Sequence, residues 1–152
     1  MTRPENPSGR ITFAERWGAD LYGDPCTGCG FTAYVCHVVD NLRIWAEGLA
    51  AAAVQLSGEV DVPGYDPDLL AEARRYHLVA PEAALWSLDQ AATAWSESVT
   101  AALDRRAVLH HAARGVQRAE DVSRNNVHDA FHHAWDIERV LAARNHRKNE
   151  NR

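Results

Sequence analysis

Residues 31–56, which read FTAYVCHVVDNLRIWAEGLAAAAVQL, carry the clearest structural pattern of this chain. Large apolar side chains recur along the stretch in alternating steps of four and three residues, which places them on one face of an α-helix. We therefore expect a long helix from about Thr32 to Leu56, ended by Ser57 and Gly58. The residues of its apolar face are Phe31, Val35, Val38, Leu42, Trp45, Leu49, Ala52 and Leu56.

Two more stretches show the same spacing. One begins at Pro81, a residue type favoured at the first position of a helix, and we expect it to reach about Leu103. The other is expected to run from about Glu120 to Arg144. The apolar face is Leu85, Leu88, Ala92, Trp95, Val99 and Ala102 in the first helix, and Val127, Ala130 or Phe131, Ala134, Ile137 and Leu141 in the second.

The remaining segments are predicted to be short or irregular. Residues 11–23 are expected to form a short helix, and a second one begins at Pro67 behind an Asp66 cap and reaches about Tyr76. Residues 105–118 show no clear period and are expected to be an irregular connector, and no segment alternates convincingly enough to predict a strand. We therefore predict an all-α fold in which three long helices and shorter elements complete a four-helix bundle.

Length and composition fit one domain. The chain has 152 residues, and we expect a flexible lead at 1–10, a single helical bundle at 11–144 and a disordered polar tail at 145–152. The net charge of −5 argues against nucleic-acid binding, and no apolar run is long enough to span a membrane. The first ten residues lack the apolar core of a secretory signal, so a cytoplasmic protein is expected.

The most suggestive chemical groups are histidines. His128 and His132 are four residues apart on the last expected helix, so their rings project from one face and suit two ligands of one metal ion. A third ligand would come from another helix, and His37 is the best candidate. His133 is rotated about 100° from His132 and fits less well. Ordinary core or surface histidines are the alternative interpretation, because such pairs also occur by chance.

Acidic side chains accompany the histidine pair. Asp136 lies four residues after His132 on the same face, where it could orient a ligand through a hydrogen bond or act as a general base. An ion pair between Asp136 and Arg139 is equally compatible with the spacing. Asp129, next to His128, is a further candidate to support a ligand, with a solvated surface charge as the alternative.

Cysteines cluster just before the helix that carries His37. Cys26 and Cys29 form a C-x-x-C unit in a turn, which could be redox-active, form a local disulfide or hold half of a zinc site. A zinc site would need a second pair, which two chains could supply across a dimer interface. A structural role that pins the turn stays open beside these. Cys36 is expected to be a small buried residue.

Two stretches together resemble the DinB-like (YfiT-like) superfamily. They are CHVVDNLR at 36–43 and, further along the chain, HDAFHHAWD at 128–136. The second is similar to actinobacterial members, which carry a histidine–aspartate pair, two residues, a histidine pair and then tryptophan–aspartate. The resemblance covers roughly residues 26–142. It implies a four-helix bundle that binds one divalent metal ion through three histidines, which map onto His37, His128 and His132.

The superfamily includes metal-dependent thiol S-transferases that use mycothiol, bacillithiol or glutathione, and a mycothiol-dependent maleylpyruvate isomerase. Zinc is the expected metal, with nickel, iron or manganese as alternatives. The chain has fifteen arginines and one lysine, a bias typical of high-GC genomes, which favours mycothiol as the cosubstrate. A metal-bound thiol loses its proton readily, and the resulting thiolate would attack a small electrophile. Asp136, Asn41 and Tyr34, in that order, are the candidates to orient groups or move protons.

The resemblance therefore implies a metal-dependent transferase with a small-molecule substrate, and members of this fold often pair as dimers. Two other functions stay open, because family membership does not fix the reaction. One is a thiol-independent metal-dependent hydrolase, isomerase or cyclase of a specialised biosynthetic pathway. The other is a non-enzymatic bundle that binds a metal or a small ligand.

Overall fold

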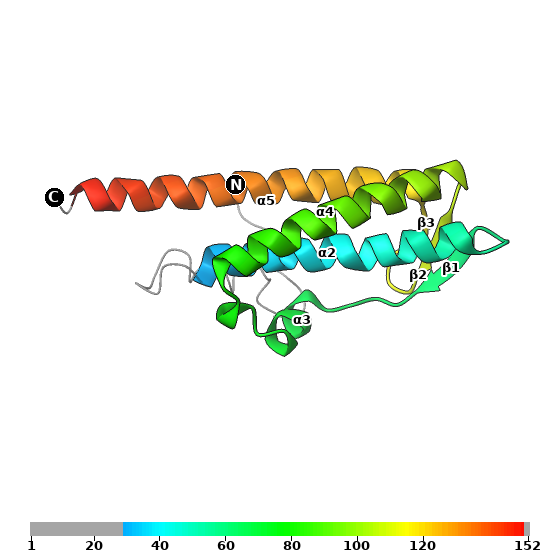
Figure 1. The fold of residues 1–152 in the computed structure, drawn as a ribbon, viewed down its shortest axis with the longest axis horizontal. Coiled ribbons are helices and arrows are strands. Elements are labelled where there is room, and N and C mark those ends of the chain that lie inside the picture. The colour runs from blue at the N-terminus through cyan, green and yellow to red at the C-terminus, as the bar shows by residue number, and fades with distance from the viewer. Residues whose placement is uncertain (1–28, 151–152) are drawn as a thin grey trace, which may run out of the picture.

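The computed structural model describes residues 29–150 (Figure 1). The expected lead at 1–10, the short helix at 11–23 and Cys26 lie outside the described residues. The described helices are α2 (Cys29–Val54), α3 (Pro67–Ala73), α4 (Pro81–Asp104) and α5 (Ala119–Glu150), with a 3-10 turn, η1 (Tyr76–Leu78). Three short strands accompany them: β1 (Glu59–Val62), β2 (Val108–His111) and β3 (Gly115–Arg118).

Helix α2 is the centre of the arrangement. Helix α4 packs along it, α5 runs antiparallel beside it, and the small sheet lies at its C-terminal end (Figure 1). The C-terminal part of α5 extends beyond the other helices (Figure 1). The predicted mostly helical class is confirmed, but the four-helix bundle is not, because the described residues contain three long helices. Within this part of the chain, no helix combines the length and apolar character needed to cross a membrane.

Helix boundaries fall close to the predicted ones. Helix α2 ends two residues before Leu56, which is fully exposed, and α4 ends one residue after Leu103. The Asp66 carboxylate caps α3 as expected and accepts hydrogen bonds from the backbone amides of Asp68 and Leu69. Helix α3 stops before Tyr76 because Arg75 adopts a left-handed conformation with φ of 51°, which a helix cannot continue through.

Helix α5 continues through residues that were expected to belong to a disordered tail. Residues 145–150 are helical, six residues past the predicted end at Arg144. The polar composition there led to the prediction of a tail. However, no glycine or proline occurs after Gly115, so nothing in the backbone chemistry stops the helix.

The irregular connector predicted for residues 105–118 is wrong. It contains β2 and β3, which pair antiparallel with His111 opposite Gly115. Strand β2 also pairs parallel with β1, so the sheet order is β1-β2-β3. Each strand has four residues, which is too short for an alternating pattern to be visible in the sequence. Gly115 has φ of 71°, and its lack of a Cβ allows the tight turn between β2 and β3.

The buried face of α5 also differs from the predicted one. Val127 and Phe131 are 66% and 76% exposed, whereas Val122 and Asn126 are buried, and His133 is half-buried. Up to His133 the observed face is therefore offset by one residue, or about 100° around the helix, whereas Ile137 packs against the core as predicted. Asn126 is tolerated inside because its amide donates to the Val122 carbonyl oxygen and accepts a hydrogen bond from α2.

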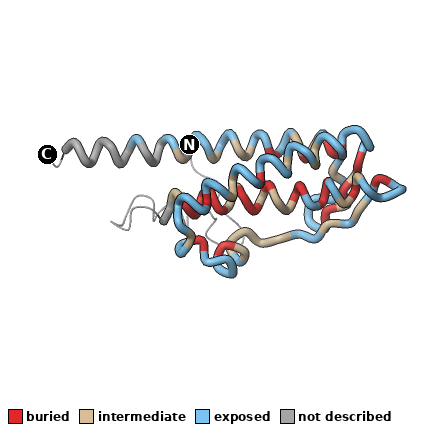
Figure 2. Tube along the Cα trace, in the orientation of Figure 1, coloured by how far each residue is buried: buried red, intermediate tan, exposed pale blue. Residues whose placement is uncertain are grey.

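Helix α4 shows a similar small offset. Ala84 and Ala91 are buried, whereas the neighbouring Leu85 and Ala92 of the predicted face are exposed. Small side chains at the contact let α4 approach α2 closely along its length. Figure 2 shows the resulting pattern, with buried positions concentrated on the inner side of α2 and fewer on the outer helices.

The sheet packs directly on the backbone of α2. Gly48 is buried, and a Cβ atom at this position would lie 3.0 Å from Cδ2 of Leu109 and 3.1 Å from Cγ1 of Val62. Leu109 itself is fully buried in the core between α2, α4 and α5. Glycine at position 48 therefore sets how closely the sheet approaches the helix.

We predict that Gly48→Val destabilises the protein by about 1–3 kcal/mol, because its added carbons overpack the contact with Leu109 and Val62. Ala50→Val is the matched control on the exposed side of the same helix, and its loss is expected to stay below about 1 kcal/mol. Urea unfolding followed by circular dichroism gives both values. Equal losses for the two variants would contradict the close approach.

Candidate functional site

A row of polar side chains on α2 faces α5. Tyr34 is 4% exposed, and its ring centroid lies 5.7 Å from that of His133 on α5. The ring of His37, one turn further along, meets the edge of His133 at 5.0 Å with an interplanar angle of 84°. Asn41 continues the row and contacts Asn126. Tyr34, His37 and Asn41 therefore lie on the side of α2 that faces α5.

The environment of His37 keeps its imidazole neutral. Burial lowers the pKa of His37 to about 4, and the neighbouring His133 adds to this effect. A histidine with this pKa carries no proton on one ring nitrogen at neutral pH. A neutral imidazole is the form of histidine that can act as a metal ligand.

His128 and His132 form a second histidine pair on α5. Their Nε2 atoms lie 3.1 Å apart, and their ring centroids are 4.4 Å apart with an interplanar angle of 79°. Both side chains are exposed. The two Nε2 atoms are thus within hydrogen-bond distance, with one ring donating its N–H and the other accepting it.

The structure therefore holds two pairs of histidines rather than one group of three. His37 meets His133, while His128 and His132 meet each other. Among the side chains that the structure describes, which exclude Cys29, Asp136 and most of 139–150, no three histidine, cysteine, aspartate or glutamate residues are grouped so that they could hold a metal ion. Sequence reasoning gave His133 little weight because of its angle to His132, and the offset of the buried face of α5 explains why it lies inside.

The side-chain amide of Asn41 joins α2 to α5 and to the loop between β1 and α3. Its Nδ2 donates to Oδ1 of Asn126 on α5 at 2.8 Å. Its Oδ1 accepts hydrogen bonds from Nε1 of Trp45 at 3.1 Å and from the hydroxyl of Tyr65 at 2.9 Å. These contacts fix α2 against α5 one turn from His37. A carboxamide has no titratable proton, and the oxygen of this one already accepts two hydrogen bonds. Asn41 therefore suits a positioning role.

The other candidates occupy different surroundings. Asp129 is half-buried, and its charge adds to the burial that raises the pKa of Tyr65, while Arg114 opposes the shift. Cys36 is buried, as expected. The side chains of Asp136 and Cys29, like the whole of Cys26, lie outside the described residues.

Histidines at the sheet end have local partners. Nε2 of His110 lies 2.9 Å from a carboxylate oxygen of Glu59. Nδ1 of His111 accepts hydrogen bonds from the backbone amides of Ala113 and Arg114, and its ring stacks on Trp45 at 5.2 Å. Burial, with a contribution from Arg114, lowers the pKa of His111. These contacts stabilise the β2–β3 turn and give His111 an ordinary structural role.

Comparisons with known proteins add no relative. No protein-family model matches the chain, and neither a curated protein nor a solved structure matches it. The resemblance to the DinB-like superfamily therefore rests on the two sequence motifs, and the functional argument rests on the residues themselves.

We predict that His37 makes the metal-free protein sensitive to acid. Its pKa of about 4 in the folded state lies below the ordinary value of 6.5, so the unfolded state binds more protons between these values. Stability is therefore highest above pH 6.5 and falls as the pH is lowered towards 4. His37→Gln should remove about 2 kcal/mol of the loss between pH 7.5 and pH 5.

Urea unfolding at both pH values, with a chelator present, measures this difference. His77→Gln is the control, because His77 is exposed and far from the α2–α5 contact in sequence. The control should keep the full pH dependence of the parent. An unchanged slope in His37→Gln would show that the ring is not held neutral by burial.

Proposed function

We propose that this protein is a metal-dependent enzyme of the DinB-like type, which binds one divalent ion and transfers a thiol of the mycothiol type to a small electrophile. His128 and His132 are the proposed primary ligands, with His37 as the third. The observation that carries the proposal is the 3.1 Å separation of the two Nε2 atoms on α5. The proposed setting is the cytoplasm, where small thiols stay reduced, and a second copy of the chain is the proposed partner.

The geometry of the pair fits this role. Imidazole nitrogens bind zinc at about 2.0–2.1 Å, so two of them on one tetrahedral ion stand about 3.3 Å apart. The observed 3.1 Å contact is close to this separation. Imidazole ligands suit zinc, nickel and iron, and zinc is the first choice for a site of nitrogen ligands.

His37 is proposed as the third ligand because its imidazole is neutral and lies on the helix that faces α5. It is separate from the His128–His132 pair in this structure and packs on His133. A ligand set drawn from two helices is typical of metal sites in helical bundles. The experiment below therefore tests His37 separately from the pair.

The bound ion would supply a positive charge that favours the thiolate form of a cosubstrate thiol. The chain's own residues would hold α2 and α5 in place around the ion. Asn41, bonded to Asn126, Trp45 and Tyr65, holds α2 at a fixed distance from α5. Tyr34, 4% exposed, fills the interior next to His133 and keeps water away from that side of the helix contact.

We predict that the untagged, chelator-treated chain binds one Zn²⁺ per molecule in a calorimetric titration. His128→Ala and His132→Ala should each weaken binding at least about a hundredfold, because removing a ligand costs more than disturbing its supporting partners. His77→Ala, which removes an exposed histidine elsewhere, is the control and should leave the affinity unchanged. His37→Ala should weaken binding at least about tenfold.

The outcomes separate the parts of the proposal. Absence of stoichiometric metal in the parent would overturn the proposal as a whole. Loss of affinity in the α5 variants alone would keep a two-histidine site and remove His37 from it. With Co²⁺ in place of Zn²⁺, added mycothiol should change the visible absorption spectrum. A loaded protein whose spectrum ignores thiols would favour a thiol-independent reaction.

A further inference from the structure

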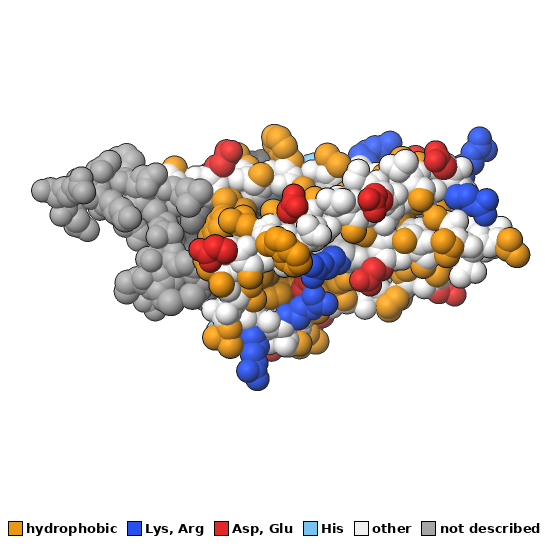
Figure 3. Space-filling view, viewed as in Figure 1, with side chains coloured by type: hydrophobic (Ala, Val, Ile, Leu, Met, Phe, Trp, Pro, Cys, Tyr) orange, Lys and Arg blue, Asp and Glu red, His pale blue; other side chains and the backbone are white. Residues whose placement is uncertain are grey.

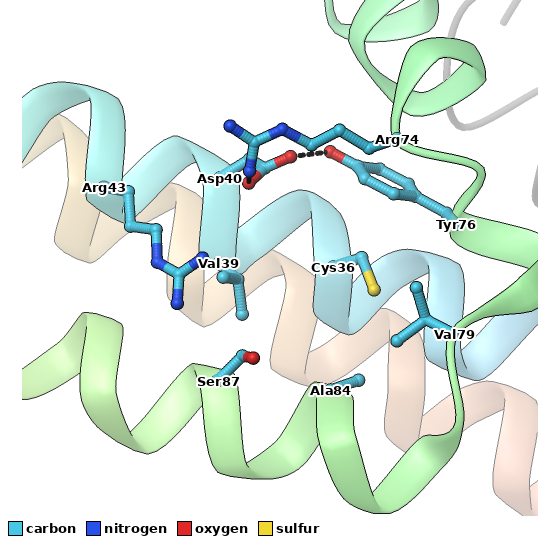
Figure 4. A pocket seen from close by; sticks show the side chains of 9 residues that line it. All are labelled: Cys36, Val39, Asp40, Arg43, Arg74, Tyr76, Val79, Ala84 and Ser87. Atoms are coloured by element: carbon cyan, nitrogen blue, oxygen red, sulfur yellow. Dashed lines mark hydrogen bonds and ion pairs between the residues drawn. The ribbon is translucent and has the colours of Figure 1, made fainter.

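A cavity of about 300 Å³ lies between α2, η1 and α4, on a different face of α2 from His37 and Asn41. Figure 4 shows that side chains from all three elements point into it. The volume lies at the small end of the range of about 300–1,000 Å³ that is typical of ligand pockets. The lining residues are Cys36, Val39, Asp40, Arg43, Arg74, Tyr76, Val79, Ala84 and Ser87.

A buried carboxylate stands at one end of the cavity. Asp40 is 3% exposed, and its two oxygens accept hydrogen bonds from different partners. Oδ1 accepts from Nη1 of Arg74, and Oδ2 accepts from the hydroxyl of Tyr76 (Figure 4). The negative charge of Asp40 is therefore neutralised by Arg74 and satisfied by two donors.

Arg43 is the remaining charged group of the wall. It lies three residues after Asp40 on α2, a spacing that normally lets the two side chains pair. Within residues 29–150, however, Arg43 makes no ion pair or hydrogen bond. Its half-buried guanidinium extends from α2 towards α4, near Ser87 (Figure 4). Two guanidinium groups and one carboxylate leave the cavity wall with one uncompensated positive charge.

The rest of the wall is neutral and largely apolar. Val39, Val79 and Ala84 contribute hydrocarbon surface. Burial, with a contribution from Asp40, raises the pKa of the Cys36 thiol to about 11, so the thiol stays protonated at neutral pH. Figure 3 shows basic and acidic side chains among hydrophobic ones in the middle of the visible face.

We propose that this cavity binds a small organic carboxylate, whose charged group pairs with Arg43 and whose hydrocarbon part packs on Val39, Val79 and Ala84. A guanidinium group matches a carboxylate in a two-pronged geometry, and the single net charge matches a monoanion. The apolar wall favours a ligand with a hydrocarbon body over inorganic phosphate.

The cavity is a different site from the row of polar side chains on α2 that faces α5. Cys36 and Asp40 mark one side of α2, whereas His37 and Asn41, the residues that follow them, face α5. Consecutive helix residues differ by about 100°, so the two rows open on different faces. The proposed carboxylate site therefore does not depend on the proposed metal site.

Ligand-detected NMR titration of the full chain tests the proposal, with phenylacetate as the probe and phenylacetamide as its uncharged counterpart. We expect saturable binding of phenylacetate and at least tenfold weaker binding of the amide. Arg43→Gln should weaken phenylacetate binding at least tenfold, because a charge-assisted contact is lost. Arg43→Lys, which keeps the charge but not the fork, should fall between the two.

Two more variants complete the test. Arg118→Gln removes an exposed arginine of β3 and should bind phenylacetate like the parent. Ser87→Leu narrows the cavity from α4 while Arg43 itself is kept, and it should also weaken binding, with circular dichroism confirming that each variant is folded. The proposal is overturned if phenylacetate shows no saturable binding at millimolar concentration, if Arg43→Gln binds as tightly as the parent, or if the amide or inorganic phosphate binds equally well.

Discussion

The burial of α2 on several sides is the constraint on which the rest of the structure depends. This helix contacts α4, α5, η1 and both β1 and β2, so much of its circumference is covered by different neighbours, while Glu47 and Ala50 stay exposed. Gly48 meets the sheet, Asn41 meets α5, and Asp40 meets the segment around η1. Besides its apolar face, a helix in this position buries some polar residues, and these must find partners inside the protein.

This constraint explains how far the fold could be predicted. The steps of three and four residues located α2 and α4 within a few residues, because each presents a regular apolar face. The same approach succeeded only in part for α5, where Ile137 packs inward as predicted, but Asn126 and His133 also lie inward and Phe131 lies outward. An apolar pattern cannot anticipate an interior position held by an amide hydrogen bond. The strands were not predicted, because four residues such as VLHH are too few to show an alternation of apolar and polar side chains.

The candidate sites show a similar division. Spacing alone placed His128 beside His132, because i and i+4 residues are neighbours on any α-helix. The partner of His37 depended on the rotation of α5, which is a tertiary property, and so His133 was underrated. The cavity at Arg43 could not be predicted from the sequence, because Arg74 and Tyr76 contribute to it from segments more than thirty residues away.

The interactions of Asp40 with its partners decide the net charge of the cavity wall. On an isolated helix, Arg43 and Asp40 would neutralise each other at their three-residue spacing. Here Arg74 and Tyr76 occupy both carboxylate oxygens, so the guanidinium of Arg43 keeps its charge for another partner. Without Arg74 the wall would hold one carboxylate and one guanidinium, with no net charge to attract an anion. The segment that follows α3 thus supplies the charge balance that makes an anion site possible.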